Sequence, residues 1–311
     1  MSPGSSDLDP RARAWFAART SAWRDWPLAD VVAAKGAHSV AVVIPARDEQ
    51  DTIADVVTQI RRDLVEGAPL VDELVVMDSL SRDQTATVAA DAGAVVHSVA
   101  DVRPDLGVRG GKGEALWKSL FVTSADLLVF IDADLTDWGP HFVTALVGPL
   151  LASDATLLVK GFYDRQLDVG EGIAAEGGRV TELVARPWLA LNRPELSAVV
   201  QPLAGEWAVR RAHIEGLSIP VGYGIEIATL IDTVDRVGVD AVAQVDLGSR
   251  GHRHQNLHDL GAMAYELLAV AERRNGRAPS SSDGVMPGIT RDRTWQVRAV
   301  DLTERPPAAG S

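Results

Sequence analysis

The sequence predicts an α/β fold with a mostly parallel sheet flanked by helices. Three short apolar runs, residues 39–44, 73–77 and 94–99, indicate buried strands, and segments with helical periodicity separate them. This alternation is typical of right-handed βαβ units. A fourth run, residues 127–131, is apolar at every position, which favours a central strand covered on both faces.

Two carboxylates stand where that fourth strand would leave the sheet. Asp132 and Asp134 are separated by Ala133, and in an extended chain such positions point to the same side. Ligands of open α/β sheets bind at the carboxyl ends of the strands. Paired carboxylates at this place suit a hard divalent cation, such as Mg²⁺ or Mn²⁺, that bridges protein and phosphate. The alternative is a plain turn, for which aspartates are equally suited.

The rest of the chain continues the alternation to a fifth strand, residues 157–161, and then departs from it. We expect an N-terminal arm that packs through its tryptophans, two halves that share the fold, and a flexible tail rich in Ser, Pro and Gly. The predicted boundaries of these parts are residues 1–38, 39–165, 166–275 and 276–311. Three predicted helices have both ends assigned, at residues 51–65, 84–92 and 257–274. Four more helices begin near residues 114, 140, 179 and 225. Two further strands lie near residue 207 and at residues 240–245.

The composition excludes several classes of function. The formal net charge is −13, which disfavours nucleic acid and anionic membranes as partners. No apolar run reaches the roughly 18 residues that a membrane span needs. The chain has no cysteine, so it has no disulfides and no thiolate metal site, and this composition fits a reducing cytoplasm.

A glycine-rich segment with one lysine is the second candidate for a binding site. Lys112 is one of four lysines in the chain, and Gly110, Gly111 and Gly113 surround it just before a predicted helix. Backbone N–H groups of such a loop can bind an anion, to which the lysine adds a positive charge. The alternative is a flexible connector.

Several stretches together resemble one family. They are VVIPARDEQDTI, VDELVVMDSLSRDQT, RGGKGEALWKSL, VFIDADL, GGRVTELVARP, QPLAGEW and GYGIEI, followed by a loop that ends in RGHRH. In this order and spacing they resemble the glucosyl-3-phosphoglycerate synthases of actinobacteria, which are retaining glycosyltransferases of the GT-A fold. The likeness covers residues 40 to about 260.

The resemblance implies which residues bind the two substrates. The residues that would bind the sugar nucleotide UDP-glucose are Pro45, Ala46, Arg47, Glu49, Ser79, Lys112, Asp132, Ala133, Leu203, Tyr223, Glu226 and Arg250. The residues that would bind the acceptor 3-phosphoglycerate are Gly178, Arg179, Val180, Thr181 and His254. Residues 39–165 would then be the nucleotide-sugar-binding half, and residues 166–275 the acceptor-binding half.

The resemblance also implies a metal site and catalytic roles. Asp134 and His252 would hold Mg²⁺ or Mn²⁺, and Lys112 would act on the diphosphate or the sugar. Glu226 is a candidate nucleophile, but it can equally bind sugar hydroxyls, and retention without a nucleophile suggests attack on the front face. The family usually has Asn where residues 47–48 are Arg-Asp, Ser in place of Ala133, and Asn in place of His254.

The implied reaction transfers glucose from UDP-glucose to the 2-hydroxyl of 3-phosphoglycerate, in a cytoplasmic homodimer. One alternative is a mannosyl-3-phosphoglycerate synthase that uses GDP-mannose. Another is a haloacid-dehalogenase-like phosphatase, since residues 132–136 also fit a DxDxT motif, although that motif normally follows the first strand. A nucleotidyltransferase should have its glycine-rich loop directly after the first strand, where this chain has residues 45–50. A non-catalytic sugar-nucleotide sensor would not need complete metal, base and acceptor motifs.

Overall fold

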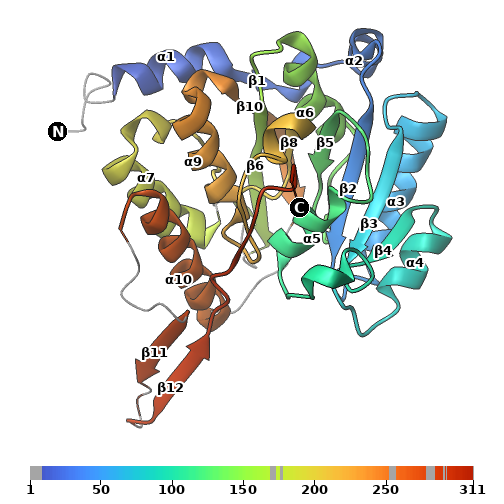
Figure 1. Cartoon of the computed structure of the whole chain (residues 1–311). Helices are drawn as coiled ribbons and strands as arrows, with labels where there is room; N and C mark the ends of the chain where they lie inside the picture. The colour runs from blue at the N-terminus through green and yellow to red at the C-terminus, as the bar shows by residue number, and fades with distance from the viewer. Residues whose placement is uncertain are drawn as a thin grey trace.

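The computed structural model describes residues 9–168, 173–175, 178–251, 257–277, 284–289, 291 and 293–310. In this part of the chain nine strands form one central sheet, in the order β1-β10-β6-β8-β5-β2-β3-β4, and β7 pairs with β6 (Figure 1). The strands are β1 (Thr20–Ala22), β2 (Val40–Ala46), β3 (Glu73–Asp78), β4 (Val95–Ser98), β5 (Leu127–Phe130), β6 (Leu158–Asp168), β7 (Ile173–Ala175), β8 (Trp207–Arg210) and β10 (Val242–Gly251).

The pairing of β2, β3, β4 and β5 confirms the predicted parallel βαβ units. β2 pairs in parallel with β3 on one side and with β5 on the other, and Val43 lies opposite both Val75 and Phe130. β3 pairs in parallel with β4. β8 runs antiparallel to both of its neighbours, β5 and β6, so the sheet is mostly but not wholly parallel.

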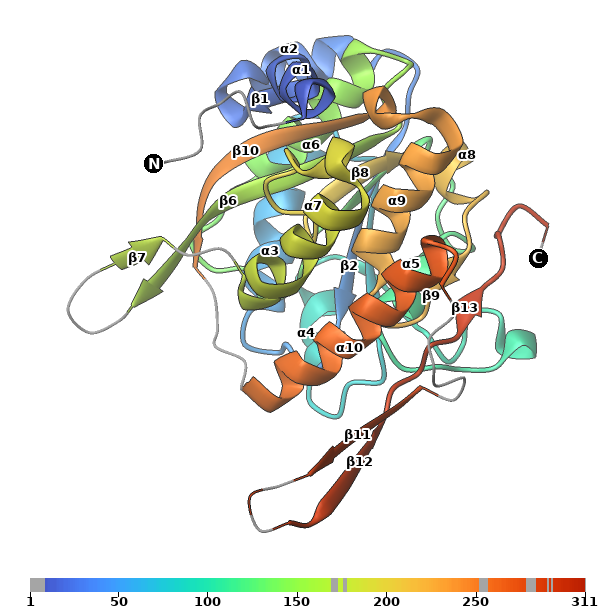
Figure 2. The same cartoon turned by 90° about the vertical axis from the view of Figure 1, so that its left-hand side faces the viewer.

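Helices cover both faces of the sheet (Figure 2). The helices are α1 (Pro10–Arg19), α2 (Leu28–Lys35), α3 (Ile53–Ile60), α4 (Thr85–Asp91), α5 (Lys112–Ser119), α6 (His141–Ala152), α7 (Arg186–Asn192), α8 (Arg211–Ile214), α9 (Ile225–Val237) and α10 (Leu257–Arg274).

Alternate residues of β2 belong to different cores, because successive side chains of a strand point to opposite faces. Ala41 and Val43 pack in the core that contains residues of α5, α9 and α10. Val40 and Val42 pack in the core that contains residues of α2, α3 and α6.

The N-terminal arm packs on the sheet of its own chain. Trp15 is buried, and its indole N–H donates to the carbonyl oxygen of Val242 at 2.9 Å. β1 then pairs in parallel with β10 at the edge of the sheet. Trp15 therefore belongs to one core of its own chain, and the partly buried Trp23 and Trp26 pack against the other.

The C-terminal segment differs from the flexible tail that the sequence indicated. β11 (Val285–Ile289) and β12 (Trp295–Ala299) form a hairpin that extends away from the body (Figure 1). β13 (Glu304–Arg305) then returns and pairs with β9 (Ile219–Pro220). The predicted boundary at residue 165 falls inside β6, so one sheet continues through both proposed halves, and the division into halves stays a prediction.

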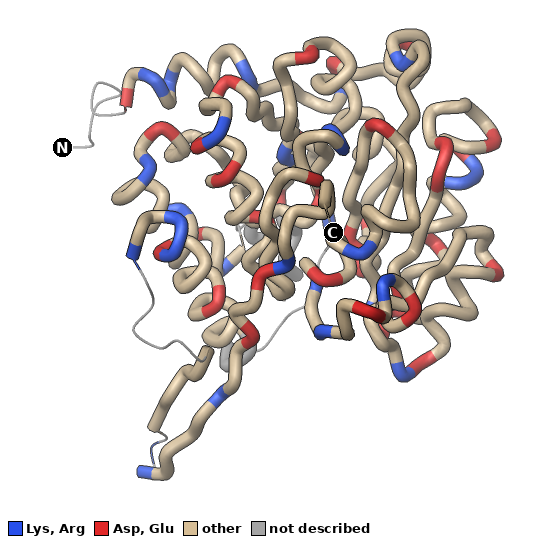
Figure 3. The backbone as a smooth tube through the Cα atoms, viewed as in Figure 1, with Lys and Arg blue, Asp and Glu red and all other residues tan. Residues whose placement is uncertain are grey.

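Positions of acidic and basic residues are interspersed along the outer helices and loops (Figure 3). The chain carries 43 acidic against 30 basic residues, so any cation that binds a phosphate has to be supplied at the site itself. None of the described helices combines the length and apolar character required to cross a bilayer.

Candidate active site

A cavity of about 490 Å³ lies where β2, β3 and β5 end, and it gathers residues from distant parts of the chain. Of the residues predicted for the site, it is lined by Pro45, Ala46, Arg47, Glu49, Ser79, Lys112, Asp132, Ala133, Asp134, Gly178, Arg179, Val180, Thr181, Leu203, Tyr223, Glu226 and Arg250. His252 and His254 lie outside the described residues. The structure therefore brings together every predicted site residue that it describes.

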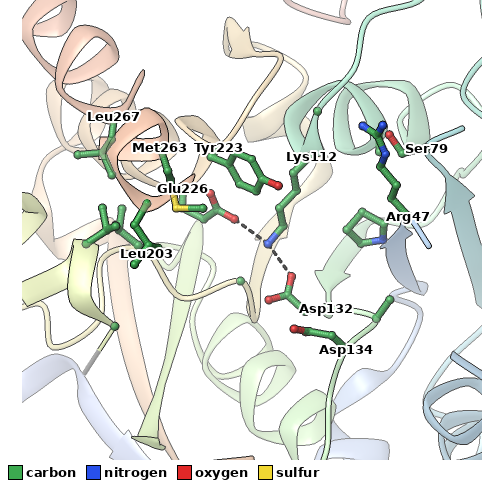
Figure 4. Close-up of a pocket in the computed structure, with 18 of the residues that line it drawn as sticks. Arg47, Ser79, Lys112, Asp132, Asp134, Leu203, Tyr223, Glu226, Met263 and Leu267 are labelled. Carbon is green, nitrogen blue, oxygen red and sulfur yellow. Dashed lines mark hydrogen bonds and ion pairs between the residues drawn. The ribbon is translucent and has the colours of Figure 1, made fainter. Parts of the chain in front are cut away.

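Lys112 joins two carboxylates across the middle of the cavity (Figure 4). Its ammonium lies 2.6 Å from Asp132 Oδ1 and 2.8 Å from Glu226 Oε1. Burial alone would lower the pKa of Lys112, but the charges of Asp132 and Glu226 and the hydrogen bonds to them raise it above its ordinary value. Lys112 is therefore a fixed positive charge at neutral pH.

Arg250 forms ion pairs with both aspartates through its buried guanidinium. It is 2% exposed, and its guanidinium donates to Glu206 at 2.6 Å, to the Tyr163 hydroxyl at 2.9 Å and to Asp134 Oδ1 at 2.8 Å. It also lies 3.5 Å from Asp132 Oδ2. Its contacts in the described chain are thus to carboxylates and a phenol, and they orient the pair that follows β5.

A divalent ion would fit this carboxylate pair. Asp132 and Asp134 supply oxygen ligands of the type that Mg²⁺ and Mn²⁺ prefer. The described residues contain no cluster of three or more potential metal ligands, so Asp134 would share an ion with the substrate or with residues outside that part of the chain. Lys112 and Arg250 link the carboxylates Asp132, Asp134, Glu206 and Glu226 through ion pairs. Arg47, Glu49 and Arg179 add further charges to the cavity lining.

A buried lysine and a glycine shape the floor of the cavity. Lys160 is 1% exposed and donates to the carbonyl oxygen of Ala204 at 2.8 Å; burial lowers its pKa to about 8. A Cβ at the adjacent Gly205 would come within 2.2 Å of Asp132 Oδ2. Lys160 and Gly205 therefore hold the chain that carries Leu203 close against the aspartate, and neither was predicted from the sequence.

The loops after β2 and β3 form the other end of the cavity, and they are tied to each other. The Ser79 amide donates to the carbonyl oxygen of Ala46 at 2.8 Å, and the Arg82 amide donates to Asp48 Oδ1 at 2.7 Å. Asp48 has a φ of 57°, a conformation that Asp tolerates better than most residues. Asp48 therefore closes the loop, while Arg47 lines the cavity.

The wall opposite the aspartates contains apolar residues that the sequence reasoning missed. Leu260, Met263 and Leu267 line it from α10, and Gly111 and Ala115 line it beside Lys112. Met263 and Leu267 lie with Leu203 on the far side of Lys112 from Arg47 and Ser79 (Figure 4). Apolar residues recur every three or four positions along α10 in the sequence. Such a period is typical of any helix face that packs on a core, so it does not indicate a cavity wall.

The predicted acceptor segment lies at the start of a helical stretch. The Glu182 amide donates to the carbonyl oxygen of Gly178 at 2.9 Å, and a π-helical segment, Thr181–Ala185, leads into α7. Val180 and Thr181 are buried and Arg179 is exposed, yet all three line the cavity. Amide N–H groups of a first helical turn favour an anion.

A mostly parallel sheet with carboxylates at the end of its central strand, beside a lysine in a cavity of this size, agrees with the GT-A glycosyltransferase class that the comparisons identify. The family model of glycosyl transferase family 2 matches residues 41–212 of the chain. A curated glucosyl-3-phosphoglycerate synthase of Mycobacterium tuberculosis is 49% identical over 294 residues, which is 91% of this chain and 89% of that protein. The chain belongs to the glucosyl-3-phosphoglycerate synthase family.

Solved structures agree with this assignment over nearly the whole chain. The Mycobacterium tuberculosis enzyme in complex with Mn²⁺, uridine-diphosphate-glucose and phosphoglyceric acid is 44% identical, with a TM-score of 0.84 over 94% of this chain and 98% of that one. The same enzyme with Mn²⁺, uridine diphosphate and glucosyl-3-phosphoglycerate is 45% identical, with a TM-score of 0.82 over 92% of this chain and 96% of that one. The mannosyl and phosphatase alternatives gain no support.

Proposed function

We propose that the protein transfers glucose from UDP-glucose to the 2-hydroxyl of 3-phosphoglycerate, with retention at the anomeric carbon and with the help of a divalent metal ion. The observation that carries this proposal is the position of Lys112, which joins Asp132 to Glu226 in one cavity. The solved relatives that hold UDP-glucose, phosphoglyceric acid and the glucosylated product support the choice of substrates.

The proposed reaction breaks the bond between C1 of glucose and the β-phosphate oxygen, and it forms a bond between C1 and O2 of the acceptor. The hydroxyl proton passes to the leaving diphosphate. A lysine ammonium has three N–H donors, and Asp132 and Glu226 account for two on Lys112. We assign the third to the diphosphate, where negative charge grows in the transition state.

Glu226 is assigned to the sugar hydroxyls and not to nucleophilic attack. It is 5% exposed, it lies in the first turn of α9, and it is paired at 2.8 Å with Lys112. A carboxylate held by a cation is a weaker nucleophile, because the ion pair stabilises its charged ground state. We propose that the acceptor attacks on the face that the diphosphate leaves, which accounts for retention without a protein nucleophile.

The metal site is proposed at Asp134, with His252 as the second protein ligand. A bound divalent ion would supply positive charge to the leaving diphosphate. In the described residues, Arg250 holds Asp134 Oδ1 at 2.8 Å and so orients the carboxylate. The acceptor is proposed to bind at residues 178–181, where the guanidinium of Arg179 and the first-turn amides suit a small dianion.

An activity matrix tests the choice of substrates. The protein is incubated with UDP-glucose, UDP-galactose or GDP-mannose, each with 3-phosphoglycerate, glycerate or no acceptor, in Mg²⁺ or Mn²⁺. We expect the UDP-glucose and 3-phosphoglycerate pair to give the highest kcat/KM. Turnover that prefers GDP-mannose would reassign the donor, and phosphate release without a donor would favour the phosphatase alternative.

We also propose a homodimer and a cytoplasmic location. The hairpin of β11 and β12 exposes 60% of Ile289, 72% of Trp295 and 67% of Val297, which is costly for a monomer and would be covered by a second copy. The lack of cysteine supports the reducing compartment. Light scattering of the wild-type protein should give twice the mass of one chain. The Trp295→Ser variant should give a lower mass, because the interface would be weakened. Fractionation of cells tests the location.

A further inference from the structure

We infer that Arg305 is a positioning residue for Lys112: the C-terminal segment, residues 301–306, acts as a strap that fixes the glycine-rich loop in its working geometry. This inference rests on the proposed function, because it assigns the effect to glucosyl transfer. Arg305 itself does not line the cavity.

The strap is anchored by a buried ion pair with the helix that starts at Lys112. Arg305 Nε donates to Glu114 Oε2 at 2.7 Å, and Arg305 Nη2 donates to Glu114 Oε1 at 2.7 Å. Glu114 is fully buried, and Arg305 is 8% exposed. The guanidinium also lies 5.2 Å from the ring centroid of Trp117, one turn further along α5. A paired contact of this kind fixes direction as well as distance.

The same guanidinium holds the loop that precedes Lys112. Arg305 Nη1 donates to the carbonyl oxygen of Leu106 at 2.8 Å, and Nη2 approaches that of Gly107 at 3.3 Å. The ammonium of Lys118, which is fully buried, donates to the same Gly107 oxygen at 2.9 Å. One side chain of the strap therefore ties the loop before Lys112 to the helix after it.

The strap also supports the segment against which the loop is packed. β13 pairs with β9, and the Val221 amide donates to the carbonyl oxygen of Thr303 at 3.0 Å. The next carbonyls face the loop: Val221 accepts from the Glu114 amide at 2.8 Å, and Gly222 accepts from the Gly113 amide at 3.0 Å. A Cβ at Gly113 would lie 1.8 Å from the carbonyl oxygen of Pro220, so this backbone contact requires glycine.

These contacts bracket Lys112, whose ammonium has to reach two carboxylates at 2.6 and 2.8 Å at once. A displacement of about 1 Å in a catalytic group can cost about 100-fold in rate. Loss of the paired contact at Glu114 frees both the loop and the first turn of α5. The expected effect is on the chemical step and on donor binding. The contacts of Arg305 described above do not involve residues 178–181, so acceptor binding is expected to change less.

The test uses Arg305→Lys in the full chain, which keeps the charge but loses the paired geometry. We expect kcat/KM for UDP-glucose to fall about tenfold or more, with the acceptor KM within about twofold of wild type. The matched control is Arg62→Lys, which breaks an exposed arginine pair with Asp63 (2.6 and 2.8 Å) outside the cavity. It should leave both parameters unchanged.

A double-mutant cycle separates positioning from stability. If Arg305 acts through Lys112, Arg305→Lys should cost less than about twofold in a Lys112→Ala background. Hydrogen exchange supplies a readout without activity: the amides of residues 113 and 114 should exchange faster in Arg305→Lys and not in Arg62→Lys. If Arg305→Lys does not fold, Glu114→Gln is judged by the same measurements.

Two results would overturn the inference: Arg305→Lys with wild-type kcat/KM, or equal losses with and without Lys112. A wild-type protein that does not use UDP-glucose and 3-phosphoglycerate would instead refute the proposed function. Faster exchange at residues 113 and 114 would then still support the strap as a clamp on the loop, and unchanged exchange would refute that as well.

Discussion

The two walls of the cavity are built in different ways. One wall consists of loops that leave the parallel strands β2, β3 and β5, and it carries Asp132 and Asp134 (Figure 4). The other comes from α9, α10 and the segments before α7 and β8, and it carries Glu226 and the apolar side chains Met263 and Leu267. We call them the sheet wall and the helical wall.

Because the two walls are held in place differently, we expect the sheet wall to carry the chemistry and the helical wall to set specificity. Strand register fixes the sheet wall, because neighbouring parallel strands end at the same edge. Single long-range contacts fix the helical wall; for example, the Gly224 amide donates to Glu266 Oε1 at 3.0 Å, across 42 residues. Lys112 joins the walls. Changes in the sheet wall and at Lys112 should therefore damage turnover most, and changes in the helical wall should tune it.

Asp134→Ala should have the largest effect. It removes the carboxylate proposed to hold the metal ion, whose charge acts mainly on the leaving diphosphate, so we expect kcat/KM to fall about a thousandfold or more. The assay compares wild type and variant in Mg²⁺ and in Mn²⁺, with circular dichroism as the folding check. Asp154→Ala, at a side chain that is 96% exposed, is the control. A folded Asp134→Ala protein within a few-fold of wild type would refute the metal assignment.

Lys112→Ala should have the second largest effect. A charge-assisted contact is worth about 1.5–3 kcal/mol, so kcat/KM for UDP-glucose should fall about 10- to 150-fold. Lys35→Ala is the control, because Lys35 pairs with Asp72 at 2.7 Å at the far end of β2 and does not line the cavity. Steady-state kinetics of both variants decide the matter. An unchanged value for Lys112→Ala would reduce the glycine-rich loop to a connector.

Arg179→Ala should affect the helical wall alone. We expect the KM for 3-phosphoglycerate to rise about tenfold, because one cationic contact to the dianion is lost. The KM for UDP-glucose should stay nearly constant. Arg186→Ala lies on the same helical stretch and outside the cavity, and it should change neither value. Equal rises in both KM values for Arg179→Ala would show that the two substrates do not bind to separate walls.

Glu266→Gln should have the smallest effect, and it should depend on pH. Burial raises the pKa of Glu266 to about 7, against a usual value of 4.5, although N–H groups of Gly224 and Tyr223 oppose the shift. The folded state therefore holds this proton more tightly than the unfolded state does. Its stabilising contribution is fully present below pH 4.5 and is lost as the pH rises through about 7.

Melting temperatures of wild type and Glu266→Gln from pH 4.5 to 9 test this sign. Relative to the variant, wild type should lose about 2 °C or more across that range and then level off. A constant difference between the two proteins would mean that Glu266 does not titrate near neutrality, so that its contact with the start of α9 is insensitive to pH.

The contrast between the walls also explains what the sequence could predict. Continuous apolar runs identified β2, β3 and β5, and the residues that follow such strands are expected at the ligand edge. Asp132 and Asp134 were therefore placed by pattern alone. The helix over 257–274 agrees with α10, because its apolar period is long and regular.

The other features of the fold and the site depend on long-range contacts, which no local sequence pattern predicts. The Ser-, Pro- and Gly-rich composition of residues 276–311 indicated a flexible tail, yet Arg305 reaches Glu114 across 191 residues. Met263 and Glu266 lie on a helix whose period indicated only a core face. Arg250 lines the cavity, and its guanidinium contacts Asp134 and Glu206, which no local pattern indicated. Its assignment to the nucleotide stays a prediction. Whether a charged side chain is buried beside an oppositely charged partner depends on how distant segments pack, so it cannot be predicted from local sequence.

The most direct test of the central claim follows the transferred carbon itself. UDP-glucose labelled with ¹³C at C1 is incubated with 3-phosphoglycerate, divalent metal ion and the protein, and the product is examined by NMR. Our account predicts a product in which the labelled C1 is bonded to O2 of the glycerate in the α configuration. Free glucose alone, a β linkage, or a labelled sugar attached to any other atom would contradict it.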